Sequence, residues 1–325
     1  MANATPLHVV TGKGGTGKTT VAAALATALA DAGRRVLLCE VEGRQGIAQL
    51  FDVPPLPYEE RKVAVGLGGG EVYALAIDPE AALLEYLQMY YRLGRAGKAL
   101  DRFGIIDFAT TIAPGVRDVL LTGKVYEAAR RRNGNGFAYD AVVMDAPPTG
   151  RIARFLNVND EVAGLARVGP VRRQADSIMA MMRSQTTQVH LVTVLEEMPV
   201  QETIDGIAEL RATNLSVGHV IVNLVQAALL GEDTRDALTS GALGTKQVAA
   251  ALRSVALDAD AAPALLDQGR AHLERQTLQD SQRDVLEATG RRIVELPSLN
   301  DTIDQGALFE LAGLLRADLL NGAES

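Results

Sequence analysis

The sequence contains a single cysteine, Cys39, and no tryptophan among its 325 residues. One thiol can form neither an intrachain disulfide nor a cysteine-based zinc site, and it cannot bind a metalloid through several thiols. The four histidines are scattered along the chain, at positions 8, 190, 219 and 272. This scatter favours packing or surface roles over metal binding.

Long apolar runs and a basic charge balance are also absent. No run approaches the ~20 apolar residues that span a bilayer as a helix, and the first residues, MANATPLHVV, lack the basic and apolar regions of a signal peptide. The net charge of −8 disfavours nucleic acids and anionic membrane surfaces as partners. We therefore expect a cytoplasmic protein that binds no nucleic acid and does not insert stably into a membrane.

Seven short runs rich in aliphatic and β-branched residues predict strands. The runs are nearly continuously apolar, which indicates strands buried on both faces of a parallel sheet. Helical patterns lie between them, so the sequence predicts an α/β fold with a mostly parallel, doubly wound sheet. The predicted strands are residues 7–11, 35–40, 72–77, 141–146, 189–194, 219–223 and 291–296.

Three intervals between these runs, 80–135, 155–187 and 226–290, are too long for simple crossover connections. Their residue patterns are mostly helical. We expect these insertions to form a helical subdomain at one end of the sheet, within a single domain that spans residues 1–325.

The second interval contains an apolar helical stripe formed by Ala175, Ile178, Met179 and Met182. A methionine-rich surface can bind adaptable apolar partners, but a stripe in the core of a helical subdomain has the same spacing. The spacing favours the core and leaves a binding surface as the alternative.

A glycine-rich segment, Gly12-Lys13-Gly14-Gly15-Thr16-Gly17-Lys18-Thr19-Thr20, lies between the first predicted strand and a helical pattern. It satisfies the phosphate-loop pattern G-x-x-x-x-G-K-[ST] in the required strand–loop–helix context. In such a loop, backbone N–H groups and the helix N-terminus bind the phosphates. We predict a nucleotide site here, with Lys18 on the β- and γ-phosphates and Thr19 as a direct Mg²⁺ ligand.

Lys13 is a second lysine in this loop, five residues before Lys18. Because Lys18 already occupies the near side of the phosphates, we expect Lys13 to point outward. It is either an ordinary exposed lysine or a residue that acts on the phosphates of a partner subunit, as an arginine finger does.

The segment KGGTGKTT, residues 13–20, resembles the deviant phosphate loop of the signature-lysine ATPases, in which the extra lysine acts across a dimer. Residues 145–156, DAPPTGRIARFL, are similar to a segment of one branch of that group, the arsenite-pump ATPases and tail-anchored-protein targeting factors. Residues 41–58 are similar to actinobacterial homologues described as anion-transporting ATPases. The resemblance implies a dimeric Mg-ATPase switch whose nucleotide state opens and closes a helical client-binding subdomain.

The same resemblance implies roles for residues outside the loop. Asp145 would hold Mg²⁺ through water, and Glu196 would contact nucleotide across the dimer. Asn223 would recognise the adenine edge, since one amide can both donate and accept hydrogen bonds. Pro297 would lie near the base.

The sequence departs from this branch after the second predicted strand, where the branch has an aspartate that positions the attacking water. Glu42 stands at that position, and Glu40 is the alternative. The branch's arsenite site needs several cysteines and its dimer zinc site a C-x-x-C pair, and this sequence has neither. We therefore expect Lys13, Lys18, Glu42 and Asp145 as catalytic residues, ATP and Mg²⁺ as cofactors, and no zinc.

Three functions are open at this point. The favoured one is the dimeric ATPase switch, whose partner is an identical chain or a paralogue and whose unidentified client is an apolar protein segment or a small molecule. The second is a positioning ATPase that cycles on a membrane or scaffold, although the C-terminal segment 304–325 lacks a basic face. The third is a metabolic enzyme with the same phosphate loop, which the segment at 145–150 disfavours.

Overall fold

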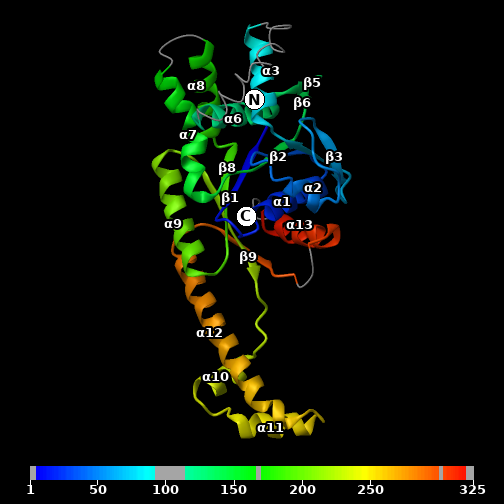
Figure 1. Cartoon of the computed structure of the whole chain (residues 1–325), viewed down its shortest axis with the longest axis vertical. Helices are drawn as coiled ribbons and strands as arrows, with labels where there is room; N and C mark the ends of the chain where they lie inside the picture. Colours follow the sequence, from blue (N-terminus) through cyan, green and yellow to red (C-terminus); the bar gives the residue numbers. More distant parts are fainter. Residues whose placement is uncertain (1–4, 92–113, 166–169, 300–302, 320–325) are drawn as a thin grey trace.

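The computed structural model describes residues 5–91, 114–165, 170–299 and 303–319 (Figure 1). Within them, eight strands form one sheet, and β5 (Arg132–Asn133) and β6 (Gly136–Phe137) form a separate hairpin. The strands of the large sheet are β1 (Leu7–Gly12), β2 (Arg35–Glu40), β3 (Arg61–Val65), β4 (Glu71–Ala76), β7 (Ala141–Asp145), β8 (Thr187–Thr193), β9 (Val217–Val225) and β10 (Ile293–Pro297).

The strand order in the large sheet is β10-β9-β8-β1-β7-β2-β4-β3. All neighbouring strands are parallel except β3, which is antiparallel to β4. This arrangement confirms the predicted α/β fold with a mostly parallel sheet. Each of the seven predicted runs coincides with one of these strands to within a few residues.

The sequence does not predict β3. This strand lies at the edge of the sheet, and Arg61, Lys62 and Val65 are exposed on it. Edge strands commonly carry charged side chains that discourage pairing with another sheet, so β3 lacks the continuous apolar run by which the other strands are found.

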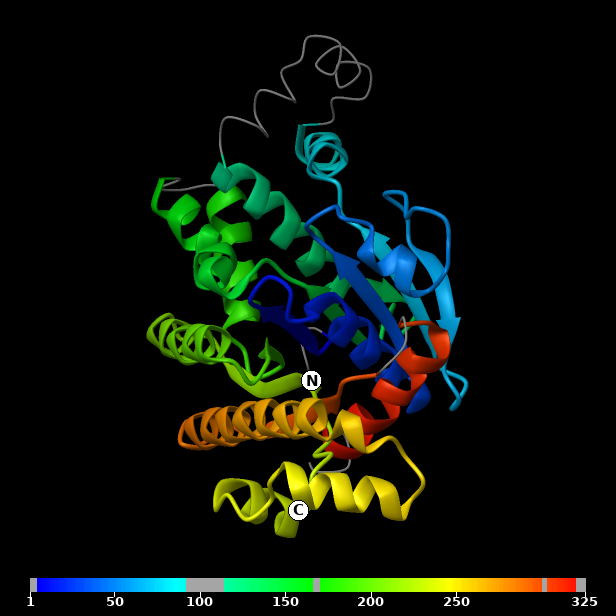
Figure 2. The same ribbon diagram turned by 60° about the horizontal axis from the view of Figure 1, so that its bottom comes forward.

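Two hydrophobic cores cover the two faces of the sheet. On one face, β1 contributes Leu7 and Val9, which pack with α6 (Pro114–Arg130), α7 (Thr149–Leu165), α8 (Pro170–Met182) and α9 (Glu197–Ala212). On the other face, Val10 packs with α1 (Lys18–Asp31), α2 (Gly46–Leu50) and α13 (Gln305–Leu319). Figure 2 shows the green helices and the red helix α13 on different sides of the sheet.

Helix α1 is alanine-rich and buried over nearly its whole length, because it lies between the sheet and α13. Small side chains allow this close approach. The helix ends at Asp31, and Gly33 follows in a left-handed conformation with φ +80°, as expected for a glycine just past a helix end.

The three long intervals do not form one subdomain. Helices α6, α7 and α8 pack together, and α3 (Pro79–Tyr91) packs on α6. The third interval forms a separate arm of α10 (Glu232–Thr239), α11 (Thr245–Ser254), η1 (Ala259–Ala261) and α12 (Ala262–Glu287). Figure 1 shows α3 and α8 at one end of the molecule and α10 and α11 at the other.

The topology explains why the prediction of one subdomain is wrong for the third interval. The first insertion follows β4, near one edge of the sheet, whereas the arm follows β9, near the other edge. Helix α12 has 26 residues, or about 39 Å of helix, and carries the arm away from the sheet. The arm has its own small core of Leu238, Val248, Ala262 and Leu266. Residues 92–113 of the first interval lie outside the described part of the chain.

The methionine-rich stripe on α8 is part of the subdomain core. Ala175, Ile178, Met179 and Met182 are all at most 3% exposed, and α8 packs against α7. The structure therefore confirms the favoured interpretation of the stripe over a binding surface.

Candidate nucleotide site

The predicted phosphate loop connects β1 to α1, as the sequence indicates. Gly17 precedes α1 with φ +82°, and a Cβ atom at this position would lie 2.3 Å from Asn223 Nδ2. Thr16 stabilises the turn, since its hydroxyl donates to the Lys13 carbonyl over 2.8 Å. The loop therefore needs glycine at residue 17 both for its backbone conformation and for the close approach of Asn223.

Three charged side chains meet beside the N-terminus of α1. Lys18 Nζ lies 2.9 Å from Glu42 Oε2 and 3.7 Å from Asp145 Oδ1. The Thr19 hydroxyl donates to Asp145 Oδ2 over 2.7 Å. Lys18 and Thr19 come from α1, Asp145 from the end of β7 and Glu42 from the loop after β2, so the fold brings together four residues from three segments.

Burial raises the pKa of Asp145 to about 6, against the opposing effects of Lys18 and of the Thr19 hydrogen bond. Asp145 is 3% exposed, and its Oδ1 atom is buried without a hydrogen-bond partner among the described residues. A buried carboxylate oxygen without a hydrogen bond destabilises the protein unless a cation or a further donor binds it.

These residues fit Mg²⁺ and a nucleotide phosphate group. A threonine hydroxyl and an aspartate carboxylate supply the hard oxygen ligands that Mg²⁺ prefers. Lys18 is 8% exposed, and its ion-pair partners among the described residues are Glu42 and Asp145, which hold its ammonium group beside the loop. The orphaned Asp145 oxygen lies at the same place.

Glu40 and Glu42, the two alternatives for orienting water, have different environments. Glu40 is 1% exposed, and its carboxylate accepts from the backbone N–H groups of Gln45 and Ile47 over 2.5 and 3.3 Å. It therefore holds the loop that leads into α2. Glu42 instead reaches Lys18 in the phosphate site.

A cleft of about 840 Å³ adjoins Glu42. Its walls include the loop at residues 41–45, the start of α3, and Arg117, Asp118 and Arg151 from α6 and α7. Burial raises the pKa of Asp118, and the nearby arginines oppose this shift. Sequence reasoning did not find the cleft, because its walls come from segments far apart in the chain.

The residues predicted to contact the base lie at the ends of β9 and β10. Asn223 is 4% exposed, and its side-chain amide donates to the Thr16 carbonyl over 2.9 Å. One of its two N–H bonds is thus used to hold the phosphate loop, which fixes the position of the rest of the amide. Pro297 ends β10 beside Val225 of β9.

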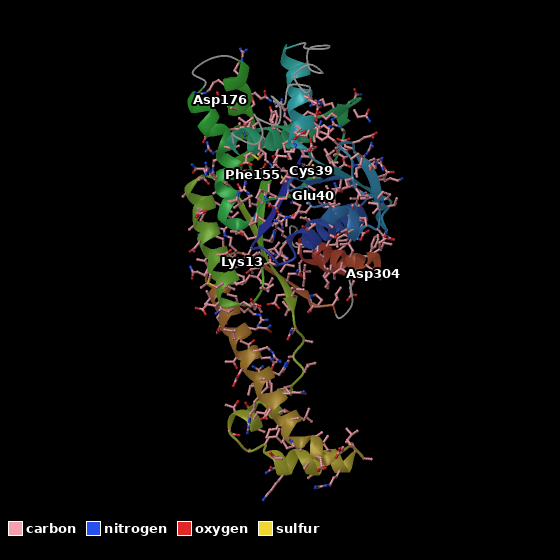
Figure 3. All side chains as sticks on the ribbon, viewed as in Figure 1. Lys13, Cys39, Glu40, Phe155, Asp176 and Asp304 are labelled. Atoms are coloured by element: carbon pink, nitrogen blue, oxygen red, sulfur yellow. The ribbon has the colours of Figure 1, made fainter. Side chains whose placement is uncertain are left out.

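Lys13 lies on the side of the phosphate loop that faces α9 (Figure 3). Its Nζ atom lies 2.8 Å from Glu202 Oε1 of α9, and both side chains are about one-third exposed. Glu196 precedes α9 and is exposed. Sequence reasoning missed Glu202, because a glutamate in an amphipathic helix carries no signal of an ion pair with a distant loop.

Cys39 is fully buried on β2, beside Glu40 (Figure 3). Burial raises the pKa of its thiol to about 12, so the thiolate needed for metal binding or redox chemistry is disfavoured.

Three of the four histidines are scattered in the sequence but not in space. His8, His190 and His219 stack across β1, β8 and β9, with neighbouring ring centroids 5.4 Å apart. The backbone N–H of His219 donates to His190 Nδ1, and His190 Nε2 lies 3.1 Å from His8 Nδ1. Neutral rings satisfy these contacts. No group of three or more histidine, cysteine or acidic residues in the described part of the chain could hold a metal ion.

The pKa values of all three rings are shifted downward, mainly by burial. That of His8 falls to about 4, with Arg34 contributing, and that of His190 falls well below its usual value. The pKa of His219 is also lowered, by burial and by Arg292. The stack is therefore a neutral packing element, consistent with the prediction of packing roles.

A phosphate loop at the end of a central parallel strand, with an aspartate at the end of the adjacent strand, defines the class of P-loop nucleotide hydrolases. The family model described as anion-transporting ATPase matches residues 6–188, more than half of the chain. The chain therefore belongs to this family and is an ATPase.

Several relatives support this membership. The ATPase BagA of Mycobacterium tuberculosis is 52% identical over 311 residues, which cover 94% of this chain and 91% of that protein. The arsenical pump-driving ATPase of Escherichia coli is 28% identical over 74% of this chain and 42% of that protein. The ATPase GET3 of Kluyveromyces lactis is 26% identical over 66% of this chain and 70% of that protein. No described helix is long and apolar enough to cross a membrane.

Proposed function

We propose that this ATPase is a dimeric, Mg-ATP-driven switch in which each subunit's Lys13 acts on the nucleotide of its partner. The partner is an identical chain or a paralogue. The nucleotide state would change the position of the helical subdomain of α3, α6, α7 and α8, which would hold an apolar protein segment or a small molecule.

The observation that carries this proposal is the meeting of Lys18, Thr19, Glu42 and Asp145 beside a glycine-rich loop, while Lys13 of the same loop pairs with Glu202 of α9. Two lysines of one loop thus point to different partners. Lys18 pairs with Glu42 and Asp145, and Lys13 pairs with Glu202 of α9, which supports different roles for the two lysines.

At the phosphates, Lys18 would exchange Glu42 for the β- and γ-phosphate oxygens. Thr19 would bind Mg²⁺ directly and Asp145 through water, and the bound ion would neutralise charge on the phosphates. Glu42, released by Lys18, is free to orient the attacking water. Glu40 is already engaged with two backbone N–H groups, which favours Glu42 for this role.

The route from the nucleotide to the client begins at the turn after Asp145. Residues 146–148 lead directly into α7, whose first residue is Thr149. Helix α7 packs against α6, α8 and α9. A displacement of the turn when the terminal phosphate leaves would therefore move a helix at the centre of the subdomain.

The C-terminal helix gives no support to a membrane-positioning function. In α13, Leu308, Leu311 and Leu315 are buried against α1 and the sheet. Its apolar side is therefore already covered within the chain and cannot serve as a membrane-surface face.

Mixing two inactive variants tests the shared site. Lys13→Ala removes the lysine supplied to the partner, and Glu42→Gln removes the group that serves the subunit's own nucleotide. In a mixed dimer, one site carries both changes and the other carries neither. Random pairing with independent sites should restore roughly a quarter of the wild-type ATPase rate.

The control is each variant alone, incubated under the same conditions, with subunit exchange demonstrated by differently labelled chains. Analytical ultracentrifugation with ATP should show a dimer. A monomer that hydrolyses ATP at the full rate, or no recovery despite subunit exchange, would contradict the proposed sharing of Lys13.

A further inference from the structure

The contact between Lys13 and Glu202 presents a conflict for the proposed function. Lys13 Nζ lies 2.8 Å from Glu202 of its own chain, yet the shared site needs this ammonium group on the phosphates of the partner. The lysine must leave Glu202 before it can cross the interface. Glu202 therefore sets the starting position from which Lys13 is delivered.

Helix α9, which carries Glu202, also touches the first residue of α7, directly after the turn at residues 146–148. Gly206 lies one helical turn after Glu202 and so lies on the same side of the helix. A Cβ atom on Gly206 would lie only 2.4 Å from Thr149 Cγ2. Thr149 is 2% exposed and is the first residue of α7, directly after residues 146–148. The helix that holds Lys13 thus contacts the start of α7, next to the turn expected to respond to the terminal phosphate.

We propose that Glu202 is a positioning residue for Lys13, holding it on its own chain in the separate subunit and releasing it to the partner when nucleotide is bound. The contact of Thr149 with Gly206 couples this release to the turn at residues 146–148. This inference rests on the proposed function, because it assumes that Lys13 acts across a dimer.

The strength of the pair suits an exchangeable contact. Both side chains are about one-third exposed, and ion pairs of this exposure are weak and sensitive to salt. A nucleotide phosphate group carries more negative charge than one carboxylate and accepts charge-assisted hydrogen bonds. Exchange of Glu202 for phosphate therefore costs the ammonium group little free energy, and Glu202 tunes the equilibrium.

The test compares Glu202→Gln with Asp205→Asn, a matched change of charge at an exposed position of the same helix. The Asp205 side chain accepts a hydrogen bond from Gln201 one turn earlier in the helix. Dimer dissociation constants are measured by analytical ultracentrifugation with a non-hydrolysable ATP analogue. Glu202→Gln should tighten the dimer about two- to thirtyfold, since two lysines are released per dimer. Asp205→Asn should leave the dimer unchanged, and Glu202→Asp should give an intermediate value.

A Lys13→Ala background shows whether Glu202 acts through Lys13. Glu202→Gln should have no effect on dimerisation in that background, because the two changes then remove the same interaction. A Glu202→Gln effect of equal size with and without Lys13 would overturn the proposal. The proposal would also be overturned if Glu202→Gln weakened the dimer, or if its dimer dissociation constant equalled that of Asp205→Asn.

A second pair of variants tests the coupling through α9. Gly206→Ala places a methyl group against Thr149 Cγ2, and it should reduce the difference in dimerisation between ATP and ADP. Adding Thr149→Ser removes that methyl group of threonine and should restore the difference. If Gly206→Ala leaves the ratio of the dimer dissociation constants with ATP and with ADP unchanged, the proposed coupling through Thr149 is wrong.

These outcomes separate the inference from the proposed function. If mixed Lys13→Ala and Glu42→Gln dimers recover activity but Glu202→Gln behaves like Asp205→Asn, only the role of Glu202 is wrong. If the wild-type chain stays monomeric with the ATP analogue, both proposals fail together.

Discussion

The centre of the sheet buries ionisable groups in two places, and the two clusters follow opposite rules. Beside the phosphate loop, Lys18 meets two carboxylates, and one oxygen of Asp145 has no hydrogen-bond partner in the part of the chain that the structure describes. In the histidine stack, three like groups contact one another and are kept neutral.

The difference shows how burial alone does not define a site. The charged cluster contains groups of both signs and an unsatisfied acceptor, so a metal and a phosphate can complete it. In the histidine stack, the ring nitrogen of His190 that faces His219 is already an acceptor for a backbone N–H. We therefore expect changes in the first cluster to affect turnover, and changes in the second to affect stability as the pH varies.

The largest effect is expected for Glu42→Gln. Loss of a positioned base should lower kcat about 10²- to 10⁴-fold and leave the Kd for ATP near that of the wild type. Single-turnover hydrolysis and equilibrium nucleotide binding measure the two quantities separately.

Glu40→Gln is the matched control for this prediction. It replaces a carboxylate oxygen that accepts from backbone N–H groups in the loop before α2, so it should lower the free energy of unfolding by about 1–3 kcal/mol. Unchanged turnover in Glu42→Gln, together with lost turnover in a folded Glu40→Gln protein, would transfer the role to Glu40.

An intermediate effect is expected for Asn223→Ala. The wild-type chain should bind ATP more tightly than GTP, because guanine presents a carbonyl where adenine presents its amine. The substitution should reduce this preference by about ten- to a hundredfold, the scale of a lost buried hydrogen bond. The Kd ratio of the two nucleotides is the measurement, because damage to the phosphate loop through Thr16 weakens both nucleotides alike. If the wild-type chain bound ATP and GTP with equal affinity, the proposed recognition of adenine by Asn223 would be wrong.

The smallest effect is expected in the histidine stack. The folded-state pKa of His8 is about 4, below the unfolded value of about 6.5. Between these values the unfolded chain binds a proton that the folded chain does not, so stability falls as the pH falls. Each histidine kept neutral should subtract about 1.4 kcal/mol per pH unit within its window.

The pKa of His190 is also lowered by burial, so replacing this residue by glutamine should reduce the pH dependence of stability below pH 6.5 by roughly one such contribution. Urea unfolding at several pH values gives the slope, and ATPase activity at neutral pH should change little in the folded variant. His272→Gln, on α12 outside the stack, controls for the loss of a histidine as such. An unchanged slope in His190→Gln would mean that this ring does not carry the effect.

The fold class, seven of the eight strands of the large sheet and the family were predictable from the amino-acid sequence. Continuous apolar runs identify strands that are buried on both faces, and the glycine and lysine spacing of residues 12–20 requires one local backbone geometry. These signals are local, because each depends on residues adjacent in the chain. The position of Asp145 at a strand end was predictable for the same reason.

Which distant residues meet became apparent from the three-dimensional structure. Glu40 and Glu42 lie two positions apart but have different partners. Glu40 accepts a hydrogen bond in the loop before α2, whereas Glu42 accepts one from Lys18. Three histidines from three strands stack on one another, and Lys13 pairs with Glu202. The insertion after β9 lies at the opposite end of the molecule from α8 (Figure 1). These outcomes depend on strand order and sheet register, which bring residues about 180 positions apart into contact. Such contacts have no counterpart in the spacing of residues along the chain.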